Sequence, residues 1–166
     1  MKINRSTKEN LNTVYYQSPV GLLEVQTTEG GLRSVNFVAE KCFNETENKH
    51  TQLTINQLEQ YFKGDRNIFD MPLDMEGTDF QKRVWQQLLK IPFGKTKSYM
   101  DIAKALGDVK AIRAVGTANG SNKIAIIVPC HRVIGSDGSL IGYAAGLERK
   151  KWLLDFEIPP MQTALF

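Results

Sequence analysis

The sequence has little cysteine and no long apolar run, and both absences narrow the kind of protein it can encode. Only Cys42 and Cys130 occur among 166 residues, too few for a disulfide framework, and neither belongs to a C-x-x-C pair suited to zinc or thiol redox chemistry. No apolar stretch approaches the roughly 18 residues of a membrane span. Residues Met1 to Ser6 place no apolar segment behind their positive charges, so we expect no secretory signal. We therefore expect a soluble, cytoplasmic protein with at least one free thiol.

The chain also lacks a large net charge, but its charges are unevenly distributed. The formal net charge is +3 for the whole chain, and it divides into −3 for residues 1–77, +8 for residues 78–151 and −2 for residues 152–166. A basic block of this kind suits a polyanionic partner, because each Lys or Arg near a phosphate releases counterions. A merely solvated surface would give the same composition.

The first half predicts a small antiparallel sheet followed by one helix. Between Val14 and Val38, three short runs rich in Val, Leu, Tyr and Phe are separated by turn signals, which is typical of a meander. The capping-box pattern of residues 54–57 predicts a helix start at Thr54, and Gly64 predicts its end. Residues 65–77 fit a connector, so we predict domains at 1–77 and 78–166.

The second half predicts mainly helices, which makes the fold class α+β. Thr78 and Gln81 form a second capping box before an amphipathic helix that ends near Pro92. Two short helices, 98–106 and about 110–119, surround a Gly-containing turn and predict a helix-turn-helix. Small residues in the second of these helices, with Arg113 among them, would suit close approach to DNA, although they would serve close packing in the core equally well.

Two further segments complete the expected fold. The apolar, β-branched run from Ile124 to Val128 predicts a buried strand or extended segment that leads to Cys130. A final helix is expected from Leu147 to about Phe156, with Leu147, Trp152, Leu153 and Phe156 buried.

The run from Pro129 to Gly135 carries the chemistry, because it places a thiol, an imidazole and a guanidinium side by side. The thiolate is the nucleophilic form of cysteine, and His131 and Arg132 would favour ionisation of Cys130. Neighbouring side chains on an extended chain diverge, so we expect a water to join Cys130 to His131. Glu157 stands at the carboxyl end of the last helix, where the dipole disfavours it, and His131 is a suitable buried partner. A packed, inert thiol is the structural alternative.

The run from Ile126 to Gly135 resembles the active-site signature of the O6-alkylguanine-DNA alkyltransferases. The resemblance covers about residues 78–157, and the pattern of residues 1–77 fits the N-terminal domain of that family. It implies a ribonuclease H-like N-terminal domain, a helical DNA-binding domain, and the activity of a methylated-DNA–protein-cysteine S-methyltransferase. Such a protein flips O6-alkylguanine, and sometimes O4-alkylthymine, out of duplex DNA and takes the alkyl group irreversibly, one turnover per molecule.

The resemblance also implies roles for individual residues. Cys130 falls at the alkyl acceptor, His131 at the base that acts through water, Glu157 at the acid that orients it, and Asn122 at the residue that braces the active-site turn. Tyr99 falls at the tyrosine that meets guanine N3, and Arg113 at the arginine that enters the base stack. The pocket for the flipped base corresponds to Tyr143 with the backbone around Val128, Cys130, Val133 and Ala144.

Departures from the family pattern concern the pocket and a metal site. Lys123 stands where relatives commonly have proline and Ala145 where glycine is usual, which leaves the range of alkyl sizes open. Cys42 and His50 are too few for the structural zinc of some relatives, so we expect no metal and no cofactor, with Cys42 a buried or incidental thiol. We expect a monomer whose partner is double-stranded DNA.

Two other functions fit parts of the pattern. A non-catalytic module that binds alkylated DNA would use Cys130 only structurally, and labelled DNA would leave such a protein unmodified. A Cys-His hydrolase would turn over repeatedly without needing Arg113, but no oxyanion-hole motif is evident.

Overall fold

A computed structural model describes residues 10–160 and has the predicted α+β fold. The strands β1 (Asn12–Ser18), β2 (Gly21–Thr28) and β3 (Gly31–Phe37) form an antiparallel sheet in the order β1-β2-β3, which confirms the meander. Residues Val14, Val25 and Val35 lie opposite one another in register and are buried. Met1 to Ser6, to which the expectation about a secretory signal applied, lie outside the described residues.

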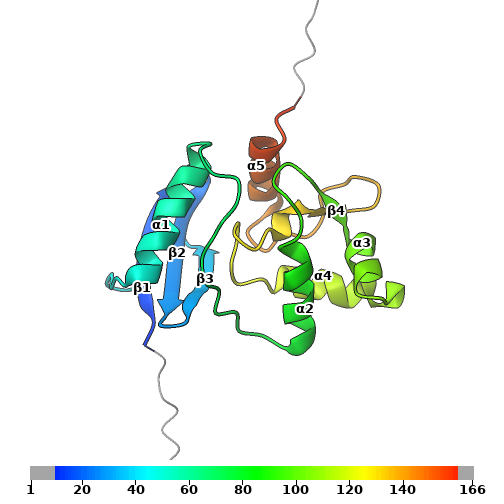
Figure 1. The fold of residues 1–166 in the computed structure, drawn as a ribbon. Coiled ribbons are helices and arrows are strands. Elements are labelled where there is room, and N and C mark those ends of the chain that lie inside the picture. The colour runs from blue at the N-terminus through cyan, green and yellow to red at the C-terminus, as the bar shows by residue number, and fades with distance from the viewer. Residues whose placement is uncertain (1–9, 161–166) are drawn as a thin grey trace, which may run out of the picture.

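Helix α1 (Lys49–Phe62) covers one face of this sheet (Figure 1). Asn48 caps the start of this helix: its side chain accepts hydrogen bonds from the backbone of His50 and Thr51, so the predicted start at Thr54 was wrong. Thr54 lies inside the helix, where its hydroxyl donates to the His50 carbonyl at 2.8 Å. A capping pattern read from sequence does not distinguish such a bond within a helix from a true cap. Gly64 follows the helix at a φ of +82°, as predicted for a stop.

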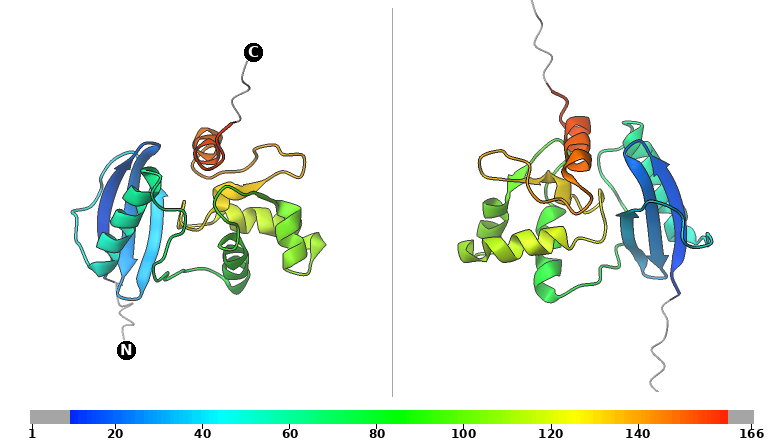
Figure 2. Two further views of the ribbon diagram at one scale, coloured as in Figure 1. Left: turned by 45° about the horizontal axis from the view of Figure 1, so that its top comes forward. Right: turned by 180° about the vertical axis from the view of Figure 1, so that it is seen from behind.

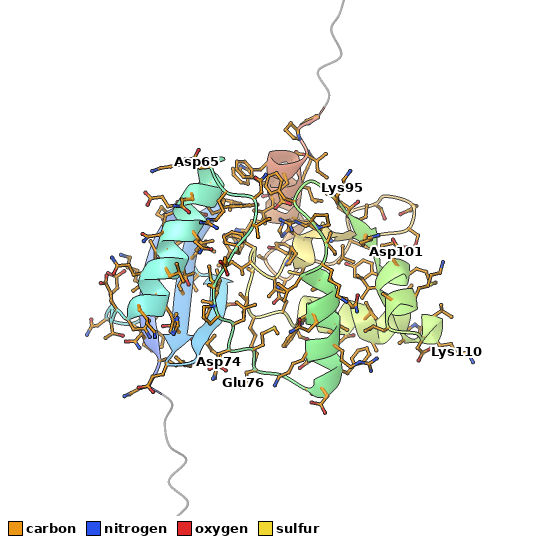
Figure 3. All side chains as sticks on the ribbon, in the orientation of Figure 1. Asp65, Asp74, Glu76, Lys95, Asp101 and Lys110 are labelled. Atoms are coloured by element: carbon orange, nitrogen blue, oxygen red, sulfur yellow. The ribbon has the colours of Figure 1, made fainter. Side chains whose placement is uncertain are left out.

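A connector leads from α1 to the helical part and stays bonded to the sheet. Its Leu73 forms a bridge with Leu32 of β3, and Arg33 of β3 pairs with Asp74 at 3.0 Å. Figure 3 shows Asp74 and Glu76 at this lower edge of the sheet. Helix α2 (Asp79–Leu88) then begins at the Thr78 capping box, which the sequence predicted.

Helices α3 (Tyr99–Ala105) and α4 (Ile112–Gly120) form the predicted helix pair, joined through the short helix η1 (Val109–Ala111). The two-residue strand β4 (Lys97–Ser98) precedes them. Helix α4 packs on α2, where the Trp85 indole donates to the Ala118 carbonyl at 2.8 Å. This pair lies at the side of the molecule opposite the sheet (Figures 1 and 2).

The run from Ile124 to Val128 is buried apart from a half-buried Ala125, but it is not extended, which corrects that part of the prediction. Ile124 bridges Val35 of the sheet, and the chain then turns at once: the Ile127 amide donates to Ala125 and the Val128 amide to Ile124. Ile126 takes a φ of +72°, a conformation that is costly for a β-branched residue. The apolar composition of this run predicted its burial correctly, but its backbone conformation depends on packing against the rest of the protein.

The chain ends with helix η2 (Cys130–Arg132), strand β5 (Val133–Ile134), which pairs in parallel with β4, and helix α5 (Leu147–Glu157). Leu153 is buried as predicted, but Leu147 in the first turn is exposed, so its predicted burial was wrong. Figures 1 and 2 show α5 between the sheet layer and the other helices. Its Phe156 lies 5.3 Å from the ring of Tyr61 in α1. None of the helices within residues 10–160 is long and apolar enough to cross a membrane.

Candidate active site

Cys130 opens helix η2 and is buried at the end of the turn that follows Ile124. Burial raises the pKa of its thiol, and the side-chain hydrogen bond of Asn122 and the charge of Lys150 offset this only in part. The expectation that His131 and Arg132 would favour a resting thiolate is therefore corrected. Arg132 is instead paired with Glu157, and His131 is a neutral base, so Cys130 keeps its proton at rest.

Glu157, the last residue of α5, is the centre of a buried hydrogen-bond network. One carboxylate oxygen, Oε2, accepts from His131 Nε2 at 2.8 Å, from the Tyr61 hydroxyl at 2.6 Å and from Arg132 Nη2 at 3.0 Å, while Oε1 accepts from Arg132 Nε at 2.6 Å. Burial alone would raise the carboxyl pKa, but the bonds and charges of His131 and Arg132 outweigh it and lower the pKa to about 2. Glu157 is thus a carboxylate at neutral pH.

The ionised carboxylate fixes the tautomer of His131. Because Oε2 can only accept, Nε2 carries the ring proton, and Nδ1 is left with a lone pair. Nδ1 is buried and has no hydrogen-bond partner among the described residues. Burial lowers the pKa of His131 despite the neighbouring carboxylate. The ring is therefore a neutral, oriented base with its accepting nitrogen free.

Asn122 holds the turn that carries Cys130, in the position at which the sequence placed a bracing residue. Its amide nitrogen donates to the Val128 carbonyl at 2.8 Å and to the Ile124 carbonyl at 3.3 Å, and its oxygen accepts from the Ile124 amide at 3.0 Å. These three bonds close the turn from both sides, so the position of the thiol depends on Asn122.

The loop between β5 and α5 is held against Cys130 by two side chains. The Tyr99 hydroxyl donates to the Ile141 carbonyl at 2.9 Å, and Lys150 Nζ donates to Val133 at 2.6 Å and to Ile141 at 2.8 Å. Lys150 was not predicted. It lies on the buried side of α5 with Leu153, Leu154 and Glu157, and a lysine at this helical spacing was the available signal. Its burial lowers its pKa to about 8.

Cys130 opens onto a cavity of about 250 Å³. Predicted residues that line it are Tyr143 and Ala144, together with Asn122, and the hydroxyl of Tyr143 is buried with no hydrogen-bond partner among residues 10–160. Val128 and Val133, which the resemblance also placed at the pocket, do not line the cavity: both are buried, and their carbonyls accept from Asn122 and Lys150. Ala145, which the sequence placed in the pocket loop, also lines the cavity. The lining that sequence reasoning missed consists of Asn36, Phe37, Asn119, Gly120, Ala125, Gly142 and Arg149.

Arg113 lies on the exposed side of α4, away from the buried network. Ala114, Thr117 and Gly120 share this exposed side, while Val115 and Ala118 face the core. Lys110, just before α4, lies at the outer end of the helix pair (Figure 3). Some small residues of α4 therefore pack in the core, and others leave an open surface around Arg113.

Cys42 lies outside this site and is exposed, which excludes the buried one of the two expected alternatives and leaves the incidental thiol. Its amide donates to the Tyr15 hydroxyl at 3.1 Å, in the loop that follows β3. Within residues 10–160, no group of three His, Cys, Asp or Glu side chains is arranged to hold a metal ion.

Two protein-family models match the chain. The ribonuclease-like domain of 6-O-methylguanine DNA methyltransferase matches residues 12–75, and the DNA binding domain of the same family matches residues 79–158. A methylated-DNA–protein-cysteine methyltransferase of Methanosarcina barkeri is 48% identical over 153 residues, which cover 87% of this chain and 97% of the relative. That of Mycobacterium tuberculosis is 57% identical over 103 residues, covering 62% of each chain.

Solved structures give the same result. The O6-methylguanine methyltransferase of Mycobacterium tuberculosis superposes with a TM-score of 0.82 at 40% identity, covering 93% of this chain and 96% of the other. A structure of the Mycobacterium tuberculosis protein in complex with DNA has a TM-score of 0.79 at 44% identity, covering 89% and 91%.

Proposed function

The chain belongs to the 6-O-methylguanine DNA methyltransferase family, and from this premise we propose that it repairs O6-alkylguanine in duplex DNA by moving the alkyl group to its own Cys130. The observation that carries the assignment is the buried thiol at a cavity beside an oriented His131–Glu157 pair. A buried nucleophile cannot reach a stacked base, so the substrate nucleotide has to leave the helix and enter the cavity.

DNA binding is assigned to the helix pair. The basic stretch 78–151 supports attraction to phosphates, and the exposed small residues of α4 support close approach of its backbone to a groove. Arg113, exposed on the same side, is proposed to occupy the space that the extruded base leaves in the stack. Tyr143 and Ala144 are proposed to receive that base in the cavity.

The proposed chemistry is one displacement at the alkyl carbon. His131 Nδ1 accepts the thiol proton of Cys130 through a water, and Sγ forms a bond to the carbon while the carbon–O6 bond breaks. The electron pair of the broken bond stays on the guanine, which takes a proton from Tyr99, and the thiol proton held by His131 returns through water to the Tyr99 oxygen. Burial raises the pKa of Tyr99, so its hydroxyl holds a proton to give. In the balance, alkyl replaces hydrogen on sulfur, and guanine is restored.

The product is a thioether, which ordinary protein chemistry does not hydrolyse, so each molecule acts once. The proposal includes two domains, 1–77 and 78–166, a division supported by the separate family matches at 12–75 and 79–158. It also includes a cytoplasmic site of action, because a free thiol persists in a reducing compartment.

Mass spectrometry of the protein after reaction with a duplex that contains O6-methylguanine tests the assignment. We expect one added methyl group, about 14 Da, on the peptide that contains Cys130, since Cys130 and not Cys42 lines the cavity. Cys42→Ser is the matched control, because it removes the other thiol and should leave the modification unchanged.

Two outcomes would overturn the assignment. A methyl group that maps to Cys42 or elsewhere would refute the role of Cys130. An unmodified protein that still binds the damaged duplex would instead establish a damage-binding module.

A further inference from the structure

Arg149, in the first turn of α5, joins the sheet to the loop over the cavity. Its Nε donates to the Val20 carbonyl in the turn between β1 and β2 at 3.2 Å, and Nη1 donates to the Ala145 carbonyl at 3.3 Å. Its guanidinium lies 4.6 Å from the ring centre of Phe37, at the end of β3. One side chain thus contacts three segments that are far apart in the sequence.

The turn before β2 leaves room for this contact. Gly21 has a φ of +140°, and a Cβ built there would lie 3.1 Å from Arg149 Nη2 and 3.3 Å from Phe37 Cδ1. Both distances are tighter than ordinary van der Waals contact. Glycine at this position therefore allows the guanidinium and the ring to stack, which indicates a built contact between the two side chains.

The same two side chains form part of the cavity wall. Phe37 and Arg149 line the cavity together with Cys130 and Ala145, and Asn36 of β3 lies beside them. The sheet therefore contributes a wall to a cavity whose nucleophile comes from the helical part. Its backbone is fixed there, because Val35 exchanges hydrogen bonds of 2.9 Å with residues 123 and 125.

We propose that the stacked pair of Arg149 and Phe37 sets the upper size of the alkyl group that Cys130 can accept. The inference rests on the proposed alkyl transfer and adds the specificity of that site. A methyl group needs little space beyond the sulfur atom, whereas a larger group has to extend along the cavity. Arg149 also donates to the Ala145 carbonyl, so the cavity wall that Arg149 and Phe37 form is linked to the loop that carries Ala145.

The test compares transfer to Cys130 from duplexes that contain O6-methylguanine or O6-benzylguanine. The measured quantity is the ratio of the benzyl to the methyl second-order rate constant. We expect Arg149→Ala and Phe37→Ala each to raise this ratio about fivefold or more, because a truncated wall favours the larger substrate selectively. The double variant should gain less than the product of the two single effects, because both changes remove the same contact.

Lys151→Ala is the matched control, since Lys151 is the exposed neighbour in α5 and pairs with Asp155. It should leave the ratio within about twofold of the wild type. Phe37→Leu accompanies Phe37→Ala and keeps an apolar side chain if the smaller one impairs folding, which thermal unfolding reports.

Ratios that stay within about twofold in the Arg149 and Phe37 variants would refute the inference, even if both rate constants fall together, because a role in holding the loop affects both substrates alike. Failure of the proposed function is a separate outcome, in which the wild-type protein accepts no methyl group at all.

Discussion

Glu157 shows how one residue can gain its properties from neighbours that differ widely in sequence position. The sequence suggested His131 as its partner because a carboxylate at a helix carboxyl end needs compensation, and the 2.8 Å contact exists. Arg132 was assigned by sequence to the thiol, but its two bonds to Glu157 commit it to the carboxylate. The sequence motif gives the order of Cys130, His131 and Arg132 along the chain. Which groups these side chains bond to depends on the backbone turn of η2.

The pKa of Glu157 predicts a specific loss of stability in acid. Its value is about 2 in the folded protein and 4.5 in the reference state, so the carboxylate adds stability above pH 4.5 that is lost as the pH falls towards 2. The difference corresponds to roughly 3 kcal/mol. Urea unfolding between pH 7 and pH 3 should therefore show a steeper decline for the wild type than for Glu157→Gln.

Other carboxylates with lowered pKa values, such as Asp74 and Asp101, titrate in both proteins and cancel from the difference between the two curves. Burial lowers the pKa of His131 while Glu157 raises it, so the difference reports the coupled His131–Glu157 pair. Parallel curves would show that the network does not hold the carboxyl group in its charged form.

At the scale of elements, the sequence predicted those whose signals are local. The meander, the Thr78 helix start and the helix pair depend on turn residues and caps a few positions apart, and all three are confirmed. The start of α1 was missed because several capping patterns occur between Asn48 and Gln57, and the contacts of Thr27 with Asn48 help to select one. The turn after Ile124 was missed because its start is fixed by Val35, far away in the sequence, and its end by the side chain of Asn122.

Arg113 on helix α4 allows a test of base extrusion. Arg113→Ala should slow repair of an O6-methylguanine duplex about tenfold or more, because the cost of unstacking the base would no longer be offset by an inserted side chain. Its reaction with free O6-benzylguanine should change by no more than about twofold, since a free base needs no extrusion. Alkylation of Cys130, followed by mass spectrometry over time, measures both.

Arg66→Ala serves as the control for the lost charge, because Arg66 is half-buried and bonds to Gln60 and Ile68 in the sheet part. Equal losses of both reactions in the Arg113 variant would place Arg113 in the chemistry or the folding of the site, and would count against the insertion role.

At the scale of the whole molecule, the sheet layer and the helical layer share the active-site network. Tyr61 is fully buried in α1, yet its hydroxyl donates to Glu157, 96 positions later, at 2.6 Å. Its ring also packs on Phe93 and Phe156. No periodicity or motif in the sequence assigns this role to Tyr61, because an inward-facing tyrosine of an amphipathic helix is ordinarily part of the core. The contact exists only once both layers are assembled.

Tyr61→Phe should therefore affect both stability and chemistry. Removing the hydroxyl leaves a buried carboxylate with one donor fewer, which should cost about 1–3 kcal/mol of unfolding free energy. The same change alters the acceptor that orients His131, so methyl transfer to Cys130 should slow by about threefold or more at pH 7.

Tyr15→Phe is the control: its hydroxyl bonds to Glu24 and to the loop of Cys42, all within the sheet part, so it should leave the transfer rate unchanged. A Tyr61→Phe protein that loses stability but transfers methyl at the wild-type rate would limit the hydroxyl to holding the layers together. Slower transfer by the folded protein would show that the sheet layer contributes to the reaction through Glu157.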